Sequence, residues 1–142
     1  MKIIRHARAT WSGPVPSGTG SMVLGRDGLV IPFSLKSRTE DGMGTNPEEL
    51  IGAAHAGCFS MALTSLIEDA GKPVGEIETS ARVTLEQRED GFWISEIHLI
   101  TQGRNQSLTE AEFKDFATKA KLTCPVSKLY ATAVITLDAS LA

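Results

Sequence analysis

The fold is decided by residues 46–60, which read Asn-Pro-Glu-Glu-Leu-Ile-Gly-Ala-Ala-His-Ala-Gly-Cys-Phe-Ser. Asn46 is a good helix cap, Pro47 suits the first helical position, and the two glutamates that follow suit the positive end of a helix dipole. The run continues to about Ala70, where a Gly-Lys-Pro sequence ends it. The sequence therefore predicts one long helix.

The predicted helix carries an unusual number of small residues, namely Gly52, Ala53, Ala54, Ala56 and Gly57. A glycine inside a helix costs up to about 1 kcal/mol of stability relative to alanine. Very close packing against another element is the expected compensation. The partner is either another part of the same chain or a second copy related by symmetry.

The remaining segments surround this helix with strands. Alternating or β-branched residues predict strands, and the pattern beginning at Ser107 resembles a capping box at the start of a second helix. The order of strands, helix, strands and helices is typical of an α+β fold. With 142 residues and no repeat or linker, we expect a single domain, 1–142. Strands are expected over 2–11, 21–24, 29–35, 74–87, 91–102 and 133–137, and helices over 107–121 and 124–130.

Charge and hydropathy exclude several classes of function. A net charge of −3 without a basic cluster argues against binding to nucleic acid or to an anionic membrane. No uninterrupted apolar segment approaches about 18 residues, and residues 1–8 lack the apolar core of a signal peptide. We therefore expect a cytoplasmic protein without a membrane span. A reducing compartment argues against a permanent disulfide.

The chain has two cysteines, Cys58 and Cys124, separated by 66 positions. A thiolate is the reactive form of cysteine. Cys124 directly precedes Pro125, where a helix can start, and a helix N-terminus stabilises a thiolate. Cys58 lies within the long helix, where burial raises a thiol pKa. On these grounds alone, Cys124 is the favoured nucleophile.

Cys58 becomes reactive only if a cation is brought to it. His55 precedes it by three positions, and Arg26 and Arg38 lie in the segments before the helix. The histidines and cysteines lack zinc-ligand spacing, so no metal is expected. Two idle buried thiols and a cycling redox pair both remain open at this point.

Two motifs together resemble the OsmC/Ohr family of thiol peroxidases, which remove organic hydroperoxides. One is Thr-Asn-Pro-Glu-Glu-Leu at 45–50 with the small-residue helix that ends in Gly-Cys-Phe at 57–59, and the other is Cys-Pro-Val-Ser at 124–127. The form of residues 33–38 is closer to the OsmC branch. The resemblance implies an OsmC-like fold, with antiparallel sheets packed around a long central helix in an intertwined homodimer.

The resemblance also implies a role for each candidate residue. Cys58 matches the peroxidatic cysteine and Cys124 the resolving cysteine, which reverses the order of the two thiols. Arg38 matches the catalytic arginine and Glu48 the carboxylate that holds it, with Arg26 as the rival arginine. An ideal helix places Glu48 and Cys58 about 15 Å apart, so the arginine must bridge them or the helix must be irregular.

The implied reaction needs no metal, flavin or haem. Cys58 reduces the hydroperoxide to an alcohol and becomes a sulfenic acid, which condenses with Cys124 to a disulfide. An external dithiol, expected to be dihydrolipoamide or a lipoylated protein, then reduces the disulfide. This antioxidant cycle is the expected function.

Other interpretations follow from the same residues. The thiols could form a redox sensor or a stress-response interaction protein without turnover, or the dimer could carry a small molecule without redox chemistry. His55 fits a packed histidine better than a general base. Four apolar residues fit either a peroxide pocket or the core: Phe33, Met43, Phe59 and Met61.

Overall fold

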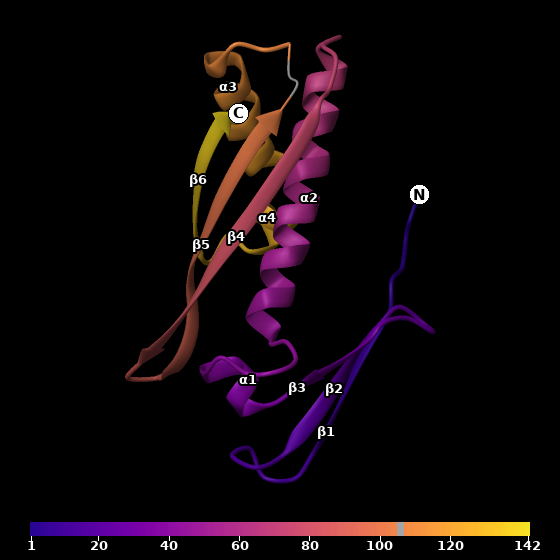
Figure 1. Cartoon of the computed structure of the whole chain (residues 1–142), viewed down its shortest axis with the longest axis vertical. Coiled ribbons are helices and arrows are strands. Elements are labelled where there is room, and N and C mark those ends of the chain that lie inside the picture. The colour runs from indigo at the N-terminus through magenta and orange to yellow at the C-terminus, as the bar shows by residue number, and fades with distance from the viewer. Residues whose placement is uncertain (105–106) are drawn as a thin grey trace. The chain divides into compact units, whose positions relative to one another are not determined.

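The computed structural model describes residues 1–104 and 107–142, which form two compact units, Met1–Leu50 and Ile51–Ala142. Strands and helices follow one another in an α+β order, as predicted (Figure 1). The elements are β1 (Ala7–Ser12), β2 (Thr19–Leu24), β3 (Val30–Phe33), α1 (Leu35–Thr39), α2 (Pro47–Asp69), β4 (Glu76–Arg88), β5 (Gly91–Arg104), α3 (Glu110–Thr123), α4 (Pro125–Leu129) and β6 (Val134–Leu141).

The first unit contains an antiparallel sheet in the order β1-β2-β3 and the short helix α1. The strand predicted over 29–35 ends earlier, because the Ser34 hydroxyl accepts from the Ser37 backbone N–H and caps α1. The Ser37 hydroxyl donates to the Thr45 carbonyl at 2.7 Å, and the Asn46 side chain donates to the Ser37 carbonyl at 2.9 Å. These bonds fix α1 to the beginning of α2.

Helix α2 begins and ends as the sequence predicts. The Asn46 side chain accepts from the Glu49 backbone N–H at 2.8 Å, which confirms the cap. At the other end, Gly71 has a φ of 69°. The Gly71 N–H donates to the Glu68 carbonyl and the Lys72 N–H to the Ile67 carbonyl, which is the Schellman arrangement. Local chemistry therefore sets both ends of this helix.

The second unit contains a sheet in the order β4-β5-β6. Alternate residues of β4 from Ile77 to Leu85 are half-buried, and those between them are exposed, as predicted. β4 and β5 are antiparallel, as expected, whereas β5 and β6 are parallel, so the expected antiparallel arrangement does not extend to this pair. A parallel neighbour needs a crossover connection, and α3 and α4 supply it.

The hydrophobic core of this unit lies between α2, α3 and one face of the sheet. α2 contributes Phe59, Leu63 and Ile67, all fully buried. A Cβ at Gly52 would lie 3.3 Å from a Val83 methyl group, so this glycine allows α2 to approach β4 closely. A Cβ at Gly57 would meet nothing within 4 Å. Packing within the chain thus explains one of the two helix glycines. The core side chains from the other elements are Ile97, Leu99, Leu108, Phe113, Ala117, Ala120 and Cys124.

By length and composition, α2 is the one helix within the described ranges that could cross a membrane, with a mean hydropathy of 1.6. Core helices of globular proteins pass the same test. Phe59, Leu63 and Ile67 of α2 lie in the core described above, and 28% of the apolar window is buried within the chain.

The start of α3 differs from the prediction. Its cap is Thr109, whose hydroxyl accepts from the Glu112 N–H, while the Glu112 carboxylate accepts from the Thr109 N–H. Ser107 and Glu110 have the same spacing but do not form the capping box. Two overlapping patterns compete here, and the later pair forms the cap.

Candidate active site

The structure brings the two cysteines together. The Sγ atoms of Cys58 and Cys124 lie 2.9 Å apart as free thiols. Cys124 is fully buried, whereas Cys58 is half-buried. A disulfide needs about 2.05 Å between the sulfurs, so a shift of less than about 1 Å would bond them. The pair is placed for reversible disulfide chemistry.

Cys124 owes its position to the turn between two helices. It is both the last capping residue of α3 and the residue before α4, with an extended ψ of 125°. Pro125 disfavours a helical conformation in the residue before it, which forces this turn. The Cys124 N–H donates to the Ala120 carbonyl, and its own carbonyl accepts from the Lys128 N–H. The sulfur is thus held from both sides of the turn.

Burial raises the pKa of the Cys58 thiol, as expected, and the neighbouring Cys124 raises it further. The backbone N–H of Val126 acts in the opposite direction and lowers the pKa of Cys58 by hydrogen bonding to its sulfur. No sequence signal pointed to this amide. Within this unit, burial outweighs the amide, so a thiolate at Cys58 needs a further positive charge.

Arg38 and Glu48 form a bidentate ion pair within the first unit. Arg38 Nη2 lies 2.6 Å from Glu48 Oε1, and Nε lies 3.1 Å from both carboxylate oxygens. Glu48 is buried in the first turn of α2, whereas the Arg38 side chain on α1 is 40% exposed. Such a fork fixes the orientation of a guanidinium. Arg26 lies exposed in the loop between β2 and β3, and no ion pair involves it among residues 1–104 and 107–142.

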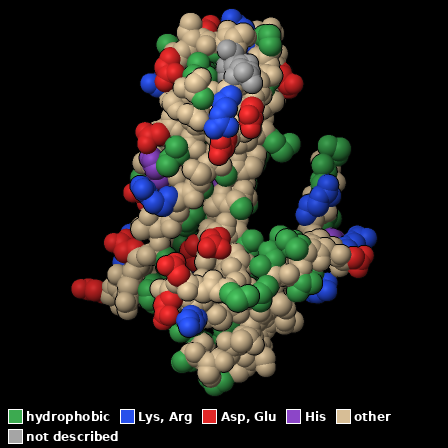
Figure 2. Space-filling view, in the orientation of Figure 1, with side chains coloured by type: hydrophobic (Ala, Val, Ile, Leu, Met, Phe, Trp, Pro, Cys, Tyr) green, Lys and Arg blue, Asp and Glu red, His purple; other side chains and the backbone are tan. Residues whose placement is uncertain are grey.

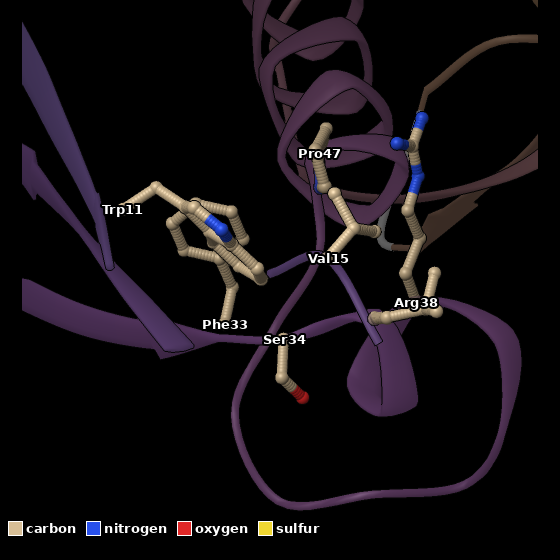
Figure 3. Close-up of a pocket in the computed structure, with 7 residues that line it drawn as sticks. Trp11, Val15, Phe33, Ser34, Arg38 and Pro47 are labelled. Carbon is tan, nitrogen blue, oxygen red and sulfur yellow. The ribbon is translucent and has the colours of Figure 1, made fainter. Parts of the chain in front are cut away.

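A mainly apolar cavity of about 230 Å³ lies beside Arg38. Figure 3 shows the Trp11 and Phe33 rings overlapping at one side and Val15 in the middle. The rings of Trp11 and Phe33 are 5.3 Å apart between centroids. Trp11 lies in a strand that carries no motif, so no signal in the sequence marked it as a site residue. The lining residues are Trp11, Val15, Phe33, Ser34, Leu35, Arg38 and Pro47.

The other candidate pocket residues lie elsewhere. Phe59 is a fully buried core residue of the second unit, as the alternative interpretation expected. Met43 and Met61 are exposed and are absent from the lining of this cavity. Of the four apolar candidates, Phe33 is the one that lines it.

His55 is a packed histidine. Its side chain is fully buried, and its Nε2 lies 2.7 Å from the Ser127 hydroxyl. The ring meets Tyr130 edge-on, with 5.6 Å between centroids. Burial lowers the pKa of His55, so the ring is neutral at pH 7. The contact with Ser127 spans 72 positions and had no signal in the sequence.

We expect the buried imidazole to make stability fall with acidity. The pKa of His55 is lowered in the folded chain, and an unfolded histidine titrates near about 6.5. As the pH falls below that value, the histidine takes up a proton in the unfolded chain but stays neutral in the folded chain. The free energy of unfolding therefore decreases, by at most about 1.4 kcal/mol per pH unit, until the folded pKa is reached.

Urea unfolding between pH 5 and 8 measures this slope, and His55→Gln should remove it. The carboxylates with lowered pKa values, Glu86, Glu110 and Glu112, are held by hydrogen bonds to neighbouring groups. They affect stability only near and below about pH 4.5, outside this window. An unchanged slope in His55→Gln would assign the effect to another group.

Comparison with known proteins gives the family. The family profile described as OsmC-like protein matches residues 39–138. The chain belongs to the OsmC family. It is 40% identical to Peroxiredoxin OsmC of Escherichia coli (strain K12) over 140 residues, which cover 97% of this chain and 96% of that protein. It is 28% identical to the organic hydroperoxide resistance protein OhrA of Bacillus subtilis (strain 168), over 82% of this chain and 89% of that protein.

A solved structure confirms the OsmC-like fold. The organic hydroperoxide resistance protein of Elizabethkingia anophelis, with thiocyanate bound, superposes with a TM-score of 0.79 and 26% identity over 100% of both chains. The expected family and the OsmC-like fold of the chain are thus confirmed, and the homodimer stays a prediction. The catalytic roles of Cys58, Cys124, Arg38 and Glu48 remain predictions, which the geometry makes testable.

Proposed function

We propose that this OsmC-family chain reduces organic hydroperoxides to alcohols, and hydrogen peroxide less well, through Cys58 and Cys124. A peroxidase-type function follows from relatives named Peroxiredoxin OsmC and organic hydroperoxide resistance protein. The observation that carries the mechanism is the 2.9 Å approach of the two sulfurs. Two idle core cysteines would have no need to meet across 66 positions.

In the first step, the Cys58 thiolate attacks one peroxide oxygen and the O–O bond breaks. Sulfur loses two electrons and becomes a sulfenic acid, and the leaving alkoxide takes a proton to give the alcohol. In the second step, the Cys124 sulfur attacks the Cys58 sulfur. The S–S bond forms, the S–O bond breaks, and the hydroxide leaves as water with the Cys124 proton.

An external dithiol completes the cycle by thiol–disulfide exchange. One thiolate opens the disulfide to a mixed disulfide, and the second displaces the remaining cysteine, leaving the reductant as a disulfide. Dihydrolipoamide or a lipoylated protein fits this role, since its two thiols close into a ring. Cys58 is half-buried rather than enclosed, which supports access for such a reductant.

Arg38 supplies the positive charge that Cys58 needs in this proposal. Glu48 engages the Nε and Nη2 atoms, and an arginine carries five N–H donors. The remaining donors can hold a thiolate and a peroxide oxygen together, with the guanidinium coming from either subunit of a dimer. The charge lowers the pKa of Cys58 and stabilises the negative charge that develops on the leaving oxygen.

The apolar cavity beside Arg38 supports an organic substrate. Trp11, Val15 and Phe33 offer hydrocarbon surface that an alkyl or aryl group would desolvate, whereas hydrogen peroxide gains nothing from it. The carbon part of the hydroperoxide would lie against these side chains, with its O–O bond toward the arginine.

We also propose a cytoplasmic homodimer. Figure 2 shows hydrophobic side chains gathered over the Met1–Leu50 unit, where Leu29, Val30 and Trp11 are exposed, and Met61 of α2 is exposed as well. Exposed apolar side chains that lie together are typical of a protein interface. Sedimentation should therefore give a mass of twice 15.2 kDa. A mass of one chain would contradict the dimer.

The test of function is the steady-state consumption of cumene hydroperoxide and hydrogen peroxide with dihydrolipoamide as reductant. We expect many turnovers per chain and a kcat/KM at least roughly tenfold higher for cumene hydroperoxide, because the apolar cavity binds its aryl group. A single oxidation of both thiols without turnover, using several dithiols, would instead indicate a redox sensor. Ligand binding without thiol oxidation would indicate a carrier.

A further inference from the structure

Two pairs of side chains join α2 to the segment 124–127, in addition to the Val126 N–H that bonds to the Cys58 sulfur. His55 and Cys58 are three positions apart on α2, and Cys124 and Ser127 are three positions apart on that segment. Cys58 meets Cys124 at 2.9 Å, and His55 meets Ser127 at 2.7 Å. The order of the two residues on α2 is the reverse of the order of their partners on the segment, so the two pairs lie side by side.

The His55–Ser127 pair is buried and neutral. His55 and Ser127 are 0% and 4% exposed. Breaking a buried hydrogen bond leaves both polar groups without a partner and without water, which is unfavourable. His55 Nδ1 has no hydrogen-bond partner within the described parts of the chain. An imidazolium would need an acceptor at that nitrogen, so the ring acts here as a neutral partner for the hydroxyl.

The segment that carries Cys124 is tied to the end of α3 by the bond from the Cys124 N–H to the Ala120 carbonyl, and only part of it is buried. α4 is five residues long, and its Lys128 and Leu129 are exposed. Val126 packs partly against the core, and the Tyr130 ring meets His55. A helix this short gains almost nothing from its own hydrogen bonds. Besides the buried Cys124 and the Val126 amide, the His55–Ser127 bond is a side-chain hydrogen bond that ties this segment to α2.

We infer that His55 and Ser127 are positioning residues whose hydrogen bond holds Cys124 beside Cys58 and thereby sets the rate of disulfide closure. This inference rests on the proposed function. It concerns the second step, since the first step needs the Cys58 sulfur and a peroxide but not Cys124.

Oxidation of Cys58 makes this positioning necessary. The sulfenic acid adds an oxygen to a sulfur that already lies 2.9 Å from the Cys124 sulfur. The distance between the two sulfurs must therefore increase while the oxygen is present. The His55–Ser127 bond does not change in that step and limits how far Cys124 moves away. Slow closure leaves the sulfenic acid open to a second peroxide, which oxidises it to a sulfinic acid.

The variants are Ser127→Ala, which removes the bond, and Ser127→Thr, which keeps a hydroxyl. Ser60→Ala is the matched control, because the Ser60 hydroxyl donates to Thr79 at 2.8 Å and links α2 to β4 two positions from Cys58. We expect Ser127→Ala to close the disulfide roughly three- to tenfold more slowly, the range of one buried hydrogen bond. The rate of the first oxidation should stay within about twofold of the wild type.

Two measurements report the rate at which the Cys58–Cys124 disulfide forms. Rapid mixing with one equivalent of cumene hydroperoxide and acid quenching gives the rates of sulfenic acid and disulfide formation by mass. Excess peroxide gives the sulfinic acid formed per turnover, which should rise in Ser127→Ala by the same factor as closure slows. Ser127→Thr should resemble the wild type, and Ser60→Ala should lose stability without slower closure.

A third measurement does not depend on peroxide chemistry. Equilibration with mixtures of dihydrolipoamide and lipoamide gives the effective concentration of one thiol at the other, which should fall in Ser127→Ala by a similar factor. This test stands even if no peroxide is turned over. Closure and equilibrium unchanged in a folded Ser127→Ala protein would overturn the inference, as would equal slowing in Ser60→Ala. If Ser127→Ala does not fold, His55→Leu tests the same bond, with His55→Gln as the conservative variant.

Discussion

Cys58→Ser is expected to abolish peroxide turnover, lowering kcat/KM for cumene hydroperoxide by at least roughly a thousandfold, as loss of a covalent nucleophile does. A serine hydroxyl does not ionise near neutral pH and cannot form a sulfenic acid. Neither Cys124 nor the ion pair of Arg38 and Glu48 replaces the lost sulfur. The measurement is hydroperoxide consumption with dihydrolipoamide, together with the mass of the protein after one equivalent of peroxide.

Cys124→Ser is the matched variant, since it removes the other sulfur of the same 2.9 Å contact. It should still oxidise once at Cys58 and accumulate a sulfenic acid that dimedone traps, but it should not cycle through a disulfide. Normal turnover in Cys58→Ser would place the nucleophile on Cys124. The helix N-terminus beside Cys124 favoured that thiol in the sequence, so this outcome has a physical basis.

Arg38→Ala is expected to lower kcat/KM by roughly a hundred- to a thousandfold, the range for removal of one preorganised donor at a developing charge. It should also shift the pH profile of Cys58 alkylation by iodoacetamide upward. Burial already raises the pKa of Cys58, and loss of the opposing cation leaves that effect uncompensated. At a fixed pH near 7, alkylation therefore slows.

Three further variants separate charge from orientation. Arg38→Lys keeps the charge but loses the two-pronged contact with Glu48, and Glu48→Gln keeps the shape but loses the counter-charge. Both should retain more activity than Arg38→Ala. Arg26→Ala is the control, because the rival arginine makes no ion pair within the described ranges and should stay near wild type. A larger loss in Arg26→Ala than in Arg38→Ala would exchange their roles.

Local signals made the long helix predictable. The cap at Asn46, the proline after it and the glycine after its end each act over a few residues, and the observed α2 agrees with the predicted helix within one residue at each end. The alternation along β4 was equally clear. By contrast, α1 was not predicted. Its first residue, Leu35, was assigned to the strand over 29–35, because most of those residues are apolar and the cap at Ser34 is weak evidence alone.

The site was predictable only in part. Residue type singled out both cysteines, and the family resemblance singled out Arg38 and Glu48, whose ion pair the structure contains. Ser127 and Trp11 could not be found in this way. A hydrogen bond that joins positions 72 apart leaves no periodic trace, and a tryptophan in an exposed strand has no distinctive neighbours.

The parallel pairing of β5 and β6 has a consequence for how the thiol pair is assembled (Figure 1). Cys124 lies between α3 and α4 in the crossover that joins these strands, and that crossover is complete only when β6 has added to the sheet. Cys58 enters its helix much earlier in synthesis, while no second thiol exists in the chain. No disulfide within the chain can therefore form until the chain has been made as far as the crossover between β5 and β6.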